Sequence, residues 1–167
     1  MPALTEISET HKLDLAAEVL KSGGEIRLQA LGTSMLPSIW PGDVLCIEHK
    51  AGGEMVRGDI VLVARDSRFF VHRLIERSEL GWLTRGDSLP QNDEPIAEAQ
   101  VLGKVSLIHR KTRATVPERR VSLFKRMLAW LLCRCDFLRN LALRFHSWWR
   151  GGALDVLVAR LALHEPR

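Results

Sequence analysis

The chain has 167 residues, of which 46% are hydrophobic and 26% are charged, with five Trp and five Phe. This length suits one domain or one domain with an appendage, and the composition excludes a disordered or low-complexity chain. Three Cys cannot build a disulfide framework, and the Cys133/Cys135 pair has no His or Cys cluster beside it. We therefore expect Cys46, Cys133 and Cys135 to be reduced structural residues in a chain that binds no metal and no cofactor.

The net charge of +4 is unevenly distributed. Residues 1–120 contain 16 Lys and Arg against 17 Asp and Glu, whereas residues 121–167 contain 8 against 3. An anionic partner should therefore meet the C-terminal part. The longest apolar run, Met127–Cys133, is too short to span a bilayer, and the N-terminus lacks the apolar segment of a signal peptide. These features predict a cytoplasmic chain without a transmembrane helix or an export signal.

Residues 1–24 form the first predicted part, a helical lead. A polar residue near Thr10 can cap a helix that runs to about Lys21, because apolar residues recur at helical spacing as far as Leu20. The pair Gly23-Gly24 then ends the helix.

Residues 25–116 form the second predicted part, a β-rich core. The segment Glu25–Ala30 alternates strictly between polar and apolar residues, as a half-buried strand does. Further strands are predicted at Val44–Glu48, Asp59–Ala64, Phe69–Glu76, Gly81–Thr84, Val101–Ile108 and Arg113–Val116. Many short strands separated by turn residues favour an antiparallel sheet or small barrel over a parallel α/β fold. With the flanking helices, the fold class is mainly β in its core and α+β overall.

Residues 117–167 form the third predicted part, a basic helical tail. Pro117 suits the first turn of a helix, and no Gly or Pro follows from Glu118 to Arg150. Spacings of three and four mark one apolar stripe: Phe124, Leu128, Leu131, Cys135, Leu138, Ala142, Phe145 and Trp149. A second, shorter helix is predicted over 154–161.

Three roles for this tail remain open. The stripe can pack on the core or on the second helix, with the Arg side chains in solvent. A basic amphipathic helix with Trp130, Trp148 and Trp149 is also suited to a lipid interface, as a peripheral membrane contact. A protein partner is the third alternative.

Three segments of the β-rich core contain residues suited to catalysis. Ser34 follows Gly32-Thr33 and precedes an apolar run, so a turn can expose it as a nucleophile. His72 shares one face of its strand with apolar neighbours, where it is either a core residue or a base. Asp87 and Asp93 follow in the segment LTRGDSLPQND, either as turn residues or as acids that orient a base.

Together these segments resemble a known family. GTSMLPSIWPGD, GDIVLV with VHRLI, LTRGDSLPQND and VLGKV match, in order, the conserved boxes of type I signal peptidases over about residues 26–108. The dipeptide His72-Arg73 is similar to the Ser–His branch of the endoplasmic-reticulum and archaeal-like enzymes. Most bacterial signal peptidases and the self-cleaving SOS-type repressors have Lys at that position. The resemblance implies a partly open β core and a serine endopeptidase that cleaves a peptide or protein precursor after small residues.

The resemblance also implies the roles of individual residues. Ser34 is the implied nucleophile, His72 the general base, Asp93 the acid that orients it, and Asp87 a second acid. The Ser34 backbone N–H would form part of an oxyanion hole. The predicted oxyanion and substrate-binding residues are Gly32, Thr33, Met35 and Ser88. Many relatives have Ser where this chain has Gly32, so a side-chain donor to the oxyanion is either missing here or supplied by Thr33 or Ser88.

The predicted location narrows the kind of protease. Without an anchor the active site should face the cytosol, so we expect a maturation protease rather than an enzyme for ordinary secretory precursors. The alternative is a non-catalytic peptide-binding module that presents a substrate or partner protein. Nucleic acid is not an expected partner, because only about 25 residues precede the core, too few for the DNA-binding domain of the related repressors.

Overall fold

The computed structural model describes residues 14–66, 68–134, 141–144 and 146. The chain divides into two compact units, Met1–Trp130 and Leu131–Arg167, and the β-sheet lies in the first. The predicted second helix over 154–161 lies outside the described residues, as does half of the predicted apolar stripe: Cys135, Leu138, Phe145 and Trp149.

The first unit begins with the predicted helix, which is present over residues 14–21. Gly23 ends it with a φ of +84°, a left-handed conformation that glycine adopts without strain. The Gly24 N–H then donates to the Val19 carbonyl at 2.9 Å, which closes the last turn. The helix end therefore lies at the predicted Gly-Gly pair.

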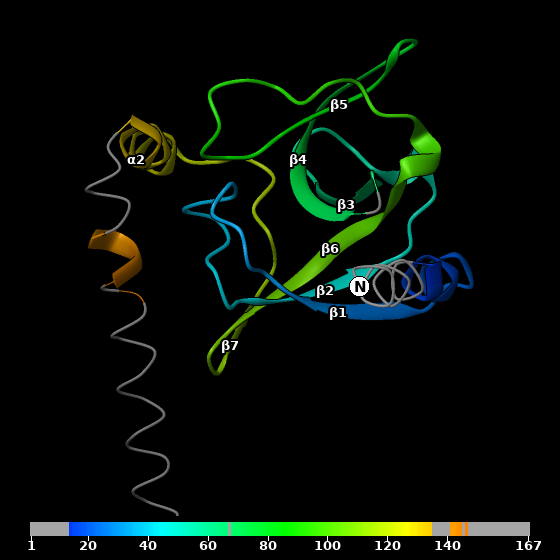
Figure 1. The fold of residues 1–167 in the computed structure, drawn as a ribbon, viewed down its shortest axis with the longest axis horizontal. Helices are drawn as coiled ribbons and strands as arrows, with labels where there is room; N and C mark the ends of the chain where they lie inside the picture. Colours follow the sequence, from blue (N-terminus) through cyan, green and yellow to red (C-terminus); the bar gives the residue numbers. More distant parts are fainter. Residues whose placement is uncertain (1–13, 67, 135–140, 145, 147–167) are drawn as a thin grey trace, which may run out of the picture. The chain divides into compact units, whose positions relative to one another are not determined.

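Seven strands form one antiparallel sheet (Figure 1), which confirms the predicted mainly β fold class. They are β1 Glu25–Gln29, β2 Val44–Glu48, β3 Ile60–Arg65, β4 Arg68–Ser78, β5 Gly81–Arg85, β6 Val101–Arg110 and β7 Arg113–Thr115. Their spatial order is β1-β2-β6-β3-β4-β5, with β7 paired to β6. The sheet is not closed, since β1 and β5 stand at opposite ends of this order. Two short 3₁₀ turns, Gly52–Glu54 and Glu98–Gln100, complete the unit.

Bulges allow this sheet to curve around a small core. The register shifts between Cys46 and Ile47 where β2 meets β6, and between Leu62 and Val63 where β3 meets β6. A third shift lies between Leu74 and Glu76, where β4 meets β5, and β4 is strongly curved in Figure 1. The curved sheet packs around two clusters of buried apolar side chains.

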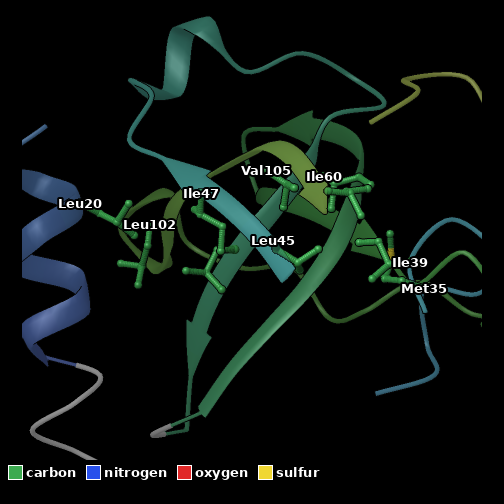
Figure 2. Close-up of a cluster of buried hydrophobic side chains, with 10 residues drawn as sticks. Leu20, Met35, Ile39, Leu45, Ile47, Ile60, Leu102 and Val105 are labelled. Carbon is green, nitrogen blue, oxygen red and sulfur yellow. The ribbon is translucent and has the colours of Figure 1, made fainter. Parts of the chain in front are cut away.

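The main core cluster joins the helix, the sheet and the turn that contains Ser34. In Figure 2 Leu20 of the helix lies beside Leu102 at one end of the cluster, and Met35 and Ile39 lie at the other. A second cluster on the β4–β5 side includes Met55, Val63, Leu74 and Trp82. Removing this apolar surface from water stabilises the sheet and holds the Ser34 turn against it.

The tail differs from its prediction at the start. The helix α2 spans Leu123–Arg134, so it begins well after Pro117, the residue expected in the first turn of the long helix. Residues 118–122 are not helical, with a bend at 119–120, because Glu118 and Arg119 bond to the core instead. The Ser122 hydroxyl accepts the Lys125 N–H at 3.3 Å as a helix cap. Residues 141–144 and 146 are also helical. Within the described ranges, every helix is too short or too polar to traverse a bilayer.

Candidate active site

Ser34, His72 and Asp93 form one continuous hydrogen-bonded line. His72 Nε2 lies 3.0 Å from Ser34 Oγ, and His72 Nδ1 lies 2.6 Å from Asp93 Oδ2. This geometry suits a neutral imidazole that donates from Nδ1 to the carboxylate and accepts the serine hydroxyl at Nε2. The structure thus brings together three residues that are 38 and 21 positions apart along the chain.

Strand pairing and a ring contact fix the position of His72 in the sheet. His72 is buried in β4, where it pairs with Val61 of β3, and its ring makes an edge contact with Phe70 at a centroid distance of 5.1 Å. A ring packed in this way cannot turn freely, so both nitrogens keep their directions. His72 therefore lies on the apolar strand face that the sequence indicates, and yet has two polar partners, Ser34 and Asp93.

Asp93 is held on the neighbouring strand by Thr84. The buried Thr84 of β5 donates its hydroxyl to Asp93 Oδ2 at 2.6 Å, and its carbonyl accepts the Asp93 N–H at 2.8 Å. The next residue, Glu94, accepts a hydrogen bond from Arg65 of β3. These contacts leave the Asp93 carboxylate pointed at the imidazole, although it sits in a loop.

The Ser34 turn is held by the segment Gly86–Ser88. The Ser88 N–H donates to the Ser34 carbonyl and the Ser88 hydroxyl donates to the Thr33 carbonyl, each at 2.9 Å. A Cβ at Gly86 would lie 2.6 Å from the Ser34 carbonyl oxygen, so only glycine permits this approach. Gly86 is therefore needed for the position of Ser34.

The four predicted oxyanion and substrate-binding residues have different surroundings. Gly32 is exposed and faces open space, and Thr33 is half-buried. Met35 is a buried member of the main core cluster, so it anchors the turn from beneath. The Ser88 hydroxyl is already bonded to the Thr33 carbonyl, which makes it a support for the turn. Within the described part of the chain, the Thr33 hydroxyl, the other predicted donor, makes no comparable hydrogen bond.

Asp87 lies close to the line of three but bonds to a different partner. Arg73 holds it in two parallel hydrogen bonds, from Nε to Oδ1 and from Nη2 to Oδ2, both 2.7 Å long. Ser38 donates its hydroxyl to Asp87 Oδ2 at 2.5 Å. Arg73 Nη1 reaches the carbonyls of Gly58 and Glu118, both at 2.7 Å. Between the two candidate acids, Asp93 is the one bonded to His72, and Asp87 ties the strand to the Ser34 turn.

Two further Gly-Asp pairs, Gly42-Asp43 and Gly58-Asp59, contain buried carboxylates. Asp43 accepts the Trp40 N–H at 2.8 Å and is paired with Arg110, whose Nη2 also donates to the Ser38 carbonyl. Asp59 accepts the Val56 N–H at 3.1 Å and is paired with Lys104 and Arg119. Burial by itself raises the pKa of Asp59, but the hydrogen bonds from Val56, Arg119 and Lys104 outweigh it and lower the pKa.

Sequence reasoning missed the supporting residues of the site. Thr84 and Arg73 both stand in the quoted segments, but their patterns do not say what they bond. A period-two strand does show that Thr84 faces the same side as Trp82, which is a buried residue. The position of Thr84 on the same strand face as an apolar Trp was the signal available from the sequence, because a hydroxyl buried there needs a hydrogen-bond partner.

We searched the described residues for a metal-binding group, a second cavity and a second nucleophile. Among the described residues, no three or more His, Cys, Asp and Glu side chains gather as a metal-binding group. A cavity of about 390 Å³ lies beside Asp59, Lys104, Pro117 and Arg119, and none of the Ser34, His72 and Asp93 side chains lines it. Burial, with the nearby Glu25 as a second cause, raises the pKa of the Cys46 thiol, so this thiol ionises less readily than a free cysteine.

A known family matches the part of the chain that contains this site. No curated protein matches the chain. The family model described as Peptidase S24-like matches residues 1–106, which include the helix, the strands β1–β5, most of β6, and Ser34, His72 and Asp93. Because this match covers more than half of the chain, the chain belongs to the Peptidase S24-like family and has a fold of the serine-peptidase type.

Proposed function

We propose that the protein is a serine endopeptidase that uses Ser34, His72 and Asp93 in a Ser-His-Asp mechanism. The observation that carries the proposal is the continuous line from Ser34 Oγ to His72 Nε2 at 3.0 Å and from His72 Nδ1 to Asp93 Oδ2 at 2.6 Å. A nucleophile bonded to a base, and a base bonded to an orienting acid, is the arrangement that activates a serine. Membership of a peptidase family supports the same class of reaction.

Each group in the line has one role in peptide-bond cleavage. Ser34 Oγ attacks the scissile carbonyl carbon while His72 Nε2 takes the hydroxyl proton. His72 then returns that proton to the leaving amine as the C–N bond breaks, and water hydrolyses the acyl-serine by the same path in reverse. Asp93 fixes the imidazole tautomer and stabilises the imidazolium that forms between these steps. The Ser34 N–H, with a second donor at Thr33, would stabilise the oxyanion.

A base of the histidine type supports placing the chain with the Ser–His branch of the signal-peptidase-like enzymes. In the branches with Lys, the base is the neutral Lys amine, which forms only when the ammonium loses its proton in an apolar pocket. Here the base has a carboxylate partner at 2.6 Å, which favours an imidazole that shuttles a proton. By analogy with that branch, the substrate class is a peptide or protein precursor cut after a small residue. The alternative is a peptide-binding module that presents a substrate without cutting it.

A serine-reactive fluorophosphonate probe tests whether Ser34 is activated. We expect the full chain to be labelled at one serine, identified by peptide mass spectrometry as Ser34. Ser34→Ala and His72→Ala should each abolish labelling, because the nucleophile and the base act as one unit. Ser106→Ala is the matched control, since the Ser106 hydroxyl only donates to the Cys46 carbonyl. Its labelling should equal that of the natural chain.

Two outcomes would contradict the proposal. Labelling of a serine other than Ser34 would reassign the nucleophile. A well-folded chain that is not labelled, but binds extended peptides with small residues, would support the presenting module instead. Endopeptidase activity is then tested with a peptide library, in which cleavage should be enriched after Ala, Gly or Ser.

A further inference from the structure

The helix α2 has its apolar side chains on the outside. Five large apolar residues of α2 are between 40% and 81% exposed: Leu123, Phe124, Met127, Trp130 and Leu131. Among the α2 side chains that the structure describes, the buried one is Ala129, the smallest side chain of the helix. This is the reverse of the usual pattern, in which the large apolar side chains of a helix face the protein core.

These five residues lie on one face of the helix, which we call the α2 apolar face. At 3.6 residues per turn, Leu123, Met127, Trp130 and Leu131 repeat on the same side, and Phe124 widens it to roughly 120° of the circumference. A continuous patch of this kind marks a contact site for another apolar phase, because scattered exposed apolar residues need no explanation but a contiguous group does. The predicted stripe through Phe124 and Leu131 thus faces outwards at both of these positions.

The charges around the α2 apolar face indicate which phase it meets. The segment Leu123–Arg134 contains Lys125, Arg126 and Arg134 and no acidic residue. Arg119 and Arg120 precede it, and residues 121–167 as a whole hold 8 Lys and Arg against 3 Asp and Glu. Lys125 lies on the opposite side of the helix and is paired with Glu118 at 2.8 Å, so the positive charge left near the face is the net excess of this part of the chain. An apolar face in a segment with excess positive charge is complementary to a lipid surface with anionic headgroups, whereas an apolar protein groove does not require that charge. Trp130 adds the side chain that prefers the boundary between lipid and water.

We infer that α2 docks the protein on an anionic membrane surface, with the α2 apolar face in the lipid and the basic residues at the headgroups. This partner is separate from the proposed protease activity, so either can fail without the other. A helix of 12 residues lies along the surface in this arrangement and does not cross it.

Vesicle co-sedimentation of the full chain tests this inference. The probes are vesicles of phosphatidylcholine alone and vesicles that contain phosphatidylglycerol as well. The natural chain should bind the mixed vesicles at least tenfold more tightly. Raising the salt from about 0.05 M to about 0.5 M should weaken that binding severalfold, because salt screens exposed charges.

The variant Phe124→Gln/Met127→Gln removes apolar surface from the face without changing any charge. We expect it to bind mixed vesicles roughly tenfold or more weakly, since burial of each such side chain in an apolar phase is favourable by more than 1 kcal/mol. The matched control is Leu80→Gln/Val116→Gln, which changes two exposed apolar residues of the sheet unit. Its binding should equal that of the natural chain. Circular dichroism and the melting temperature confirm that both variants are folded.

A second readout uses the natural chain itself. Lipids brominated on their acyl chains should quench part of its Trp fluorescence, and Trp130→Phe should remove a share of that quenching. The inference is overturned if the natural chain does not bind mixed vesicles, or if Phe124→Gln/Met127→Gln binds them as the natural chain does. It is also overturned if the double variant leaves vesicle binding intact but dissociates an oligomer or lowers the melting temperature, because protein then covers the face.

Discussion

The two hydrogen bonds of the His72 ring form one continuous line from Ser34 to Asp93. Ser34 lies at one end of it, 3.0 Å from Nε2, and Asp93 lies at the other, 2.6 Å from Nδ1. Asp93 has a second donor in Thr84 at 2.6 Å, so its carboxylate is oriented before any substrate arrives. Such preorganisation is what allows a weak nucleophile to react in one position.

The two candidate acids, Asp93 and Asp87, should respond differently to replacement by Asn. Asp93→Asn keeps the size of the side chain but favours the wrong imidazole tautomer, so we expect the labelling rate of Ser34 to fall by about 10⁴ with little change in stability. Asp87→Asn instead leaves the buried Arg73 guanidinium without its carboxylate, which should cost about 3–5 kcal/mol of unfolding free energy. Labelling kinetics and urea unfolding of both variants measure the two effects.

The opposite pairing of effects would exchange the roles of the two acids. If Asp87→Asn abolished labelling at full stability while Asp93→Asn labelled normally, Asp87 would be the orienting residue. The matched reference for both is Asp66→Asn, since Asp66 is an exposed residue between β3 and β4.

At the scale of elements, the site depends on how closely two turns approach each other. The Ser34 turn comes before β2, and the Gly86–Ser88 turn follows β5 at the end of the strand order. The contacts between them include two hydrogen bonds from Ser88, the hydrogen bond from Ser38 to Asp87, and the approach of Gly86 to the Ser34 carbonyl. The nucleophile is therefore positioned by a long-range contact and not by its own turn.

Gly86→Ala tests this long-range contact. The new methyl group would stand 2.6 Å from the Ser34 carbonyl oxygen, so the two turns must separate. A displacement of about 1 Å in an active site can cost about 10²-fold in rate, and we expect a loss of that order in Ser34 labelling. Gly53→Ala is the control, because a Cβ there has no atom within 4 Å. Equal labelling of the two variants would show that the contact is dispensable.

A second element-scale prediction concerns the charge cluster around Asp59, which joins β6 to the segment before α2. Its lowered pKa means that the carboxylate stabilises the fold at pH values above its unfolded pKa of about 3.9. This stabilisation is lost as the pH falls through the lower folded value. Asp59→Asn should therefore reduce the unfolding free energy by about 1–3 kcal/mol at neutral pH, and by progressively less towards about pH 2. Urea unfolding of both chains across this range measures the difference, and a difference that did not change with pH would contradict it.

At the scale of the molecule, the folded sheet unit extends beyond the part that the family shares. The family match ends at residue 106, within β6. Yet the Glu118 carbonyl accepts Arg73 Nη1 at 2.7 Å, and Arg119 Nε donates to Asp59 at 2.8 Å. The segment between β7 and α2 thus closes the buried charge groups of the core, which explains why the long predicted helix starts late.

Shortened chains test where the sheet unit ends. A chain that stops after Ser122 retains both contacts, whereas one that stops after Pro117 loses them. The shorter chain should be less stable by about 2 kcal/mol, mainly because a buried charged donor loses its acceptor. The comparison uses urea unfolding of the two chains at one pH. Equal unfolding free energies would mean that residues 118–122 only lie on the surface.

The pattern of local residues was enough to predict most elements of this protein. Strand alternation and turn residues predicted all seven strands to within a few residues, and Gly23-Gly24 predicted the end of the first helix. These features depend on neighbours in the chain, so they can be read from short windows. The resemblance to signal peptidases supplied Ser34, His72 and Asp93 as a group, which the short windows alone did not single out.

The tertiary structure decided how these elements are joined. The order β2-β6-β3 pairs strands far apart in the sequence, and no local pattern encodes such a pairing. The same holds for the charges: Asp87, Asp59 and Asp43 lie 14, 60 and 67 positions from Arg73, Arg119 and Arg110, and each pairing depends on the folded sheet. For α2, the apolar spacing predicted the helix, but only the packing of Ala129 determined that its larger side chains face outwards.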